Sequence, residues 1–227
     1  MKSSLALRTW AILWKDLLIE LRTKQSFSAM VFFAALVLFL FGFAIGPDAA
    51  TLSRLGGGLL WIAIAFTGML SLGRTFQSEE VAGGLDGLRM YPGEIRAIYL
   101  GKLLTNFSML VVLEVVLVPV AAVLLQLEPW DRFPLFVGIT LLGTFGFSVV
   151  GTFYASLTQH LRARELMLPL LLFPALVPVF LGAVNGTTLA LAGDPLDRIG
   201  GWIRLLIAFD IIFFVVCVWI FPLVLVE

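Results

Sequence analysis

Six stretches of this 227-residue sequence are long and apolar enough to cross a lipid bilayer. A helix needs about 20 apolar residues to span the hydrocarbon core, where every backbone polar group must be satisfied internally. The chain is 60% hydrophobic and only 13% charged, with a mean hydropathy of +1.05. The sequence therefore predicts an all-α integral membrane protein, a six-helix transmembrane bundle forming one domain over 1–227, with spans at 28–46, 56–73, 102–125, 133–157, 166–192 and 202–225.

The basic residues are distributed unevenly between the two sets of connections. Eleven of the 15 fall at the termini and in alternate connections, whereas Arg54, Arg132, Arg198 and Arg204 fall in the others. Basic segments stay on the cytoplasmic side of a membrane. We therefore expect both termini in the cytoplasm. Lys+Arg equals Asp+Glu over the whole chain, which gives no indication of nucleic-acid binding.

Residues 1–27 predict a cytoplasmic elbow helix that leads into the first span. Apolar residues recur there at helical spacing, and cations recur every seven positions on the other side. Tryptophan opposite cations suits a helix in the headgroup plane, in contact with membrane lipid. The alternative is a basic start that only sets topology. The apolar set is Trp10, Leu13, Trp14, Leu17, Leu18 and Leu21, and the cations are Arg8, Lys15 and Arg22.

The connection at 74–101 is the longest and is predicted to be a cytoplasmic coupling loop. It combines acidic and apolar residues, a composition typical of a surface that docks a partner. An ordinary solvated loop is the alternative. The candidate docking residues for a separate ATPase are Phe76, Gln77, Glu79, Glu80, Leu85, Asp86 and Leu88.

The sequence contains no group typical of catalysis or of metal binding. The only Gly-Lys pair, Gly101-Lys102, is followed by Leu103 and lacks the spacing of a phosphate-binding loop. His160 is the single histidine and Cys217 the single cysteine, which leaves no multi-histidine or cysteine cluster for a metal. We expect a non-catalytic chain without catalytic, cofactor-binding or metal-ligating residues of its own.

Five residues inside the spans are unusual for a membrane. Pro169, Pro174 and Pro178 predict a kinked or broken fifth span, because each removes a backbone donor. Glu114 and Asp210 are intramembrane acids, which are costly unless they face protein or water. They could line a proton or substrate path, or form a protonated or hydrogen-bonded pair. Asp210 could also lie near the outer interface.

The layout is similar to that of ABC-2-type exporter membrane subunits, and the cytoplasmic motifs resemble the CcmB family, the haem exporter B subunits of cytochrome c maturation. The motifs are Trp14-Lys15-Asp16, Glu20-Leu21-Arg22, Phe76-Gln77-Ser78-Glu79-Glu80, Gly84-Leu85-Asp86-Gly87-Leu88 and the Lys102 that opens the third span. The resemblance implies a permease subunit in the bacterial inner membrane.

The same resemblance implies several partners. They are an ABC ATPase subunit like CcmA that binds ATP, a haem-handling membrane subunit like CcmC, a single-span subunit like CcmD and a haem chaperone like CcmE. Haem is a candidate substrate. The expected function is coupling of the partner's ATP hydrolysis to haem export or to release of the haem-loaded periplasmic chaperone. The alternatives are an exporter permease for a lipid or drug and a non-transporting assembly scaffold.

Overall fold

The computed structural model describes residues 5–46, 48–76, 95–128, 130–159, 161, 163–193 and 198–226. All regular secondary structure in these residues is helical. The helices are α1 (Leu5–Thr23), α2 (Gln25–Ile45), α3 (Ala49–Arg74), α6 (Arg96–Leu124), α7 (Phe133–Thr158), α8 (Arg164–Ala192) and α9 (Ile199–Val226).

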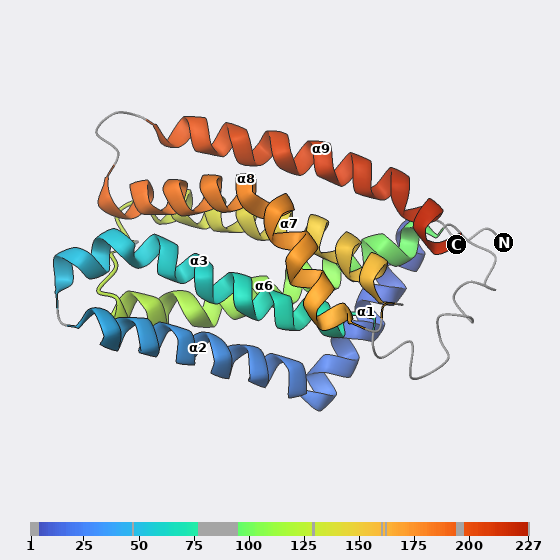
Figure 1. Ribbon diagram of the computed structural model, residues 1–227, viewed down its shortest axis with the longest axis horizontal. Helices are drawn as coiled ribbons and strands as arrows, with labels where there is room; N and C mark the ends of the chain where they lie inside the picture. The colour runs from blue at the N-terminus through green and yellow to red at the C-terminus, as the bar shows by residue number, and fades with distance from the viewer. Residues whose placement is uncertain are drawn as a thin grey trace.

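Six of these helices are long and apolar enough to span a membrane, which confirms the predicted all-α fold class. The candidate spans within the described residues are Ser26–Ile45, Arg54–Arg74, Arg96–Leu124, Phe133–Thr158, Leu166–Ala192 and Ile199–Leu223. They run side by side along the long axis of the molecule, and α1 crosses the end of the bundle where α9 finishes (Figure 1). The ends of α3 and α7 and the starts of α6 and α8 lie at this same end. We call it the α1 end.

Close packing at the centre depends on small residues of α7. A Cβ added to Gly143 would overlap the Trp61 ring of α3 and lie 2.9 Å from the Cβ of Ala183 on α8. The Trp61 indole donates a 3.0 Å hydrogen bond to the hydroxyl of Thr187, which fixes its ring between the three helices. Small residues allow such close helix packing in membranes. Lipid is as apolar as the helix surfaces, so the hydrophobic effect does not drive the helices together, and close van der Waals contact must stabilise their association.

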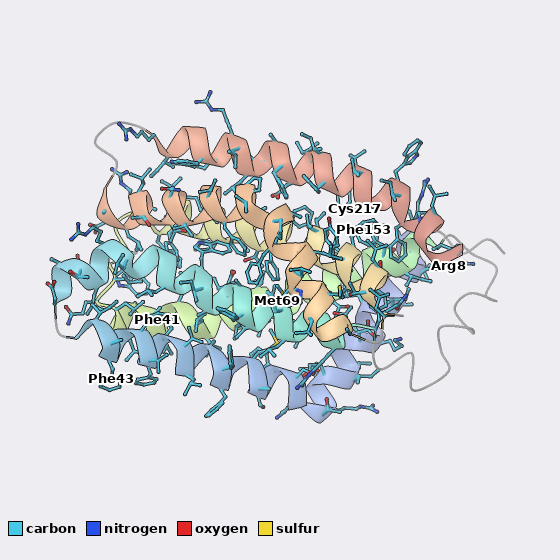
Figure 2. All side chains as sticks on the ribbon, viewed as in Figure 1. Arg8, Phe41, Phe43, Met69, Phe153 and Cys217 are labelled. Atoms are coloured by element: carbon cyan, nitrogen blue, oxygen red, sulfur yellow. The ribbon has the colours of Figure 1, made fainter. Side chains whose placement is uncertain are left out.

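The outer surface of the bundle is apolar, as lipid requires. Phe32, Phe43, Val123 and Trp219 are each at least 71% exposed. Phe41 packs against the core, and Figure 2 shows Phe43, two positions later on α2, directed away from the bundle. This alternation distinguishes the lipid-facing side of the helix from the side that faces protein.

Two helices begin before the predicted spans. The helix α3 begins at Ala49, although its candidate span begins at Arg54, close to the predicted 56. The Asp48 side chain caps this longer helix, because it accepts hydrogen bonds from the Ala50 amide and the Thr51 hydroxyl. The hydrogen bond from Thr51 is the main cause that lowers the pKa of Asp48. The helix α6 begins at Arg96, so residues 96–101 of the predicted coupling loop belong to the third span.

The predicted bend between the elbow and the first span is present, and α8 is continuous. Lys24 separates α1 from α2 with a left-handed backbone (φ 52°), and the Glu20 carboxylate accepts a 2.7 Å hydrogen bond from the Phe27 amide. The three internal prolines of α8 do not break it, but it changes direction part-way along its length (Figure 1). Neighbouring helices allow a proline-containing span to remain helical.

Gly143 provides a test of the packing. We expect Gly143→Ala to lower the free energy of unfolding by about 1–3 kcal/mol, because the added methyl group meets a fixed indole ring. Gly138 lies on the same helix, and a Cβ added there has no neighbour within 4 Å. Gly138→Ala should be neutral or raise stability by up to about 1 kcal/mol. Unfolding in mixed detergent micelles measures both, and equal effects would contradict the packing described.

Candidate functional site at the junction of the elbow helix and the third span

Lys102 is a buried cation near the start of α6. It is 2% exposed, and its Nζ lies 2.9 Å from Oδ2 of Asp16 on α1. The Asp16 side chain is 10% exposed, and its other oxygen lies 3.3 Å from Nζ of Lys15. An isolated charge in such a place would cost several kcal/mol, so burial of each group depends on the other. The ion pair therefore joins the elbow helix to the third span.

The helices α1 and α6 approach each other closely beside this ion pair. A Cβ at Gly101 would lie 2.6 Å from a side-chain carbon of Ile12 and 3.3 Å from the backbone oxygen of Thr9. Thr9 and Leu13 are the buried residues of α1. The absence of a side chain at position 101 thus allows the elbow helix to lie directly on α6.

The outward side of α1 carries the two tryptophans. Trp10 and Trp14 are 63% and 54% exposed, and their rings stack at 6.4 Å. The predicted apolar side of the elbow is therefore divided: Leu13 is buried, whereas the tryptophans are available to a lipid interface. Sequence reasoning does not identify Asp16 as a site residue. The signal that could have identified it is its position three residues after Leu13, on the side of α1 that the buried residues occupy.

Phe76 brings the end of the second span to the same place. Its side chain is 4% exposed, and its ring centroid lies 5.8 Å from Nζ of Lys102, within reach of a cation–π interaction. Phe76 is the last described residue before the connection. Phe76 is thus buried in the isolated chain, and its role in docking stays a prediction. We call Asp16, Lys102 and Phe76 the elbow joint.

Hydrogen bonds extend from this joint to α7. The Thr75 hydroxyl donates to Oδ1 of Asn106 at 2.9 Å, and Nδ2 of Asn106 donates to the Thr152 hydroxyl at 3.0 Å. Asn106 is 3% exposed. The end of α3 is therefore linked to α6 and α7 by polar contacts, which fix its position more strictly than apolar packing alone.

The remaining predicted docking residues are Gln77, Glu79, Glu80, Leu85, Asp86 and Leu88, and they lie outside the described residues. Their proposed role stays a prediction. His160 also lies outside them. In the part of the chain that is described, no three His, Cys, Asp or Glu side chains gather as metal ligands would.

The two intramembrane acids do not form a hydrogen-bonded pair. Glu114 is buried and accepts a hydrogen bond from the Thr144 hydroxyl, whereas Asp210 lies against Gly146 and Val179. Neither oxygen of Asp210 has a hydrogen-bond partner among the described residues. Thr144 and Gly146 are two positions apart, about 200° around α7, so the two carboxyls lie on opposite sides of that helix. Asp210 is 4% exposed, so its carboxyl is enclosed by protein.

The ion pair of the elbow joint makes a direct prediction. Lys102→Met removes the buried cation of Asp16 and leaves it only the half-exposed Lys15 ammonium at 3.3 Å, which should cost up to about 3–5 kcal/mol of stability. Lys102→Met combined with Asp16→Asn should cost clearly less, since no charge is then left unpaired. Arg22→Met, at an exposed cation of α1, is the matched control. Detergent unfolding of Lys102→Met, Asp16→Asn, the double variant and Arg22→Met gives a coupling energy, and additive effects of the two single substitutions would show that the pair does not hold α1 in place.

Comparison of the sequence with known proteins identifies the family of this chain. The CcmB protein family model matches residues 7–225. The heme exporter protein B of Paracoccus denitrificans is 33% identical over 190 residues, covering 83% of this chain and 87% of that protein. The Rhodobacter capsulatus protein of the same name is 35% identical over 171 residues, 75% of this chain and 78% of its own length. The Haemophilus influenzae protein is 31% identical over 172 residues, 76% and 77% of the two chains. This chain belongs to the CcmB family.

Proposed function

We propose that this chain is the membrane subunit of a haem-export complex that serves cytochrome c maturation. Its relatives bear the name heme exporter protein B. Its own sequence lacks a phosphate-binding loop, so the free energy for the work comes from ATP bound by a separate ATPase subunit. The ATPase hydrolyses ATP, and this chain conveys the resulting movement across the bilayer.

The observation that carries this proposal is the elbow joint. Residues on both sides of the connection that follows the second span, Phe76 before it and Lys102 after it, contact each other, and Lys102 is paired with α1. A partner that moves this connection therefore acts on the C-terminal end of α3, on the start of α6 and on the elbow helix together. ATP can shift the equilibrium between two positions of this connection only if the ATPase binds the connection differently in its nucleotide-bound and nucleotide-free states.

The docking surface for that ATPase would be the connection itself. Glu79, Glu80 and Asp86 supply its charge and Leu85 and Leu88 its apolar anchors. The α1 end of the bundle faces the cytoplasm of a bacterial inner membrane, in agreement with the excess of basic residues in its connections. The other partners are membrane subunits like CcmC and CcmD, and the cargo is haem delivered to, or released on, a periplasmic chaperone like CcmE.

Charge reversal at Glu80 tests the docking surface. In cells lacking the chromosomal copy, Glu80→Lys should reduce co-purification of the ATPase and lower the amount of c-type cytochrome by about tenfold. A decrease of this size is typical when one coupling interaction between two sites is lost. Glu128→Lys reverses an exposed acid at the opposite end of the bundle and should leave both unchanged. If Glu80→Lys retains the ATPase as well as Glu128→Lys does, the connection is not the docking site.

Lys102→Met combined with Asp16→Asn separates transmission from docking. This variant keeps the connection but lacks the ion pair, so the ATPase should still co-purify while c-type cytochrome falls. An assembly scaffold behaves differently, because it would also support maturation with an ATPase that binds but does not hydrolyse ATP. Normal maturation with such an ATPase would overturn the proposed coupling.

A further inference from the structure

A cavity of about 550 Å³ lies near the α1 end of the bundle, between α2, α3, α7 and α8. Its volume is in the range of pockets that bind small molecules. The helices α2 and α8 both pack on α3, and the cavity lies over α3 where residues of all three helices line it. Met69, labelled on α3 in Figure 2, is one of its lining residues.

The polar side chains that line this cavity all lie at one end of it. Its inner part is formed by Phe33, Phe66, Met69 and Leu70. Its outer part combines Arg74, Thr158 and Gln159 with apolar Phe76, Leu168 and Pro169. Arg74 is the last residue of α3 and is exposed. Phe66 is eight positions earlier on the same helix, about 12 Å deeper. A cation thus lies at the interface end of an apolar channel.

The inner wall is aromatic and open to the side. The ring of Phe66 meets those of Phe33 and Phe173 edge to face, each at 6.4 Å, and so connects α3 to both flanking helices. Phe66 and Leu70 remain 46% and 39% exposed. A Cβ added to Gly73 has no neighbour within 4 Å, which leaves the region beside Arg74 unfilled. A molecule in the bilayer can enter from the side without passing through water.

We propose that this cavity binds one anionic phospholipid, with an acyl chain along Phe66, Met69 and Leu70 and its phosphate at Arg74. A free phosphate would gain nothing from the apolar inner part. A zwitterionic lipid such as phosphatidylcholine carries its own cation, which offsets the attraction of its phosphate to Arg74. Only a charged amphiphile matches both ends, and a bilayer supplies one at this depth. Phe76 also lines the cavity, so the bound lipid contacts a residue of the elbow joint.

Native mass spectrometry of the purified full chain tests the proposal, with phosphatidylglycerol and phosphatidylcholine added at equal concentration. Phosphatidylglycerol should bind preferentially, and Arg74→Gln should weaken its binding about fivefold. Arg54→Gln, at the exposed cation of the opposite end of α3, should leave the preference unchanged. Equal binding of the two lipids, or equal effects of the two substitutions, would overturn it. So would displacement of the lipid by inorganic phosphate alone.

A second variant tests the apolar part. Gly73→Leu adds a side chain where open space exists and should reduce binding of both lipids, whereas Gly201→Leu, at an exposed helical glycine with equally open surroundings, should not. Unchanged lipid binding by Gly73→Leu would show that the lipid lies elsewhere. Should Gly73→Leu fail to fold, the comparison of Arg74→Gln with Arg54→Gln still decides the outcome. Neither measurement depends on haem or ATP.

Discussion

Hydrocarbon offers no hydrogen-bond partner to a peptide group, so each stretch of this chain that enters the bilayer does so as a helix. Six such helices have few ways to associate, since lipid is as apolar as their side chains. One way to pack them is seen at Gly143, which lies against Trp61 and Ala183. The missing side chain lets three helices meet there. The same solution recurs where Gly101 lets the elbow helix lie on α6.

Polar side chains inside the bundle are concentrated on α7. Thr140, Thr144, Ser148, Thr152 and Ser156 recur every four positions and are all buried. Some of their hydroxyls donate to backbone oxygens one turn earlier, as Ser148 does to Thr144, which satisfies them at little cost. Others reach neighbouring helices: Thr144 donates to Glu114, and Thr152 accepts from Asn106. The helix α7 therefore provides both close apolar packing and many of the polar contacts inside the bundle.

Hydropathy and charge predict most of the fold, because a membrane span is determined by its own composition and length. The six spans and the elbow follow from local pattern alone. Boundaries such as Ala49 depend on the single cap at Asp48, which hydropathy does not detect. Phe76 could not be placed from the sequence, since an aromatic residue beside acids is compatible with either a docking anchor or a buried contact. Its position is decided by Lys102, 26 residues later in the chain, and such long-range contacts leave no periodic signal.

The account depends on which side of the membrane holds the α1 end, because only a joint in the cytoplasm can be moved by an ATPase. Cysteine labelling in spheroplasts measures this directly once the buried Cys217 is replaced by alanine. A membrane-impermeant maleimide should label Asp131→Cys, which is exposed between α6 and α7, in intact spheroplasts. It should label Arg22→Cys, exposed on α1, only after the membrane is opened. Labelling of Arg22→Cys from outside, with Asp131→Cys protected, would contradict the proposed coupling.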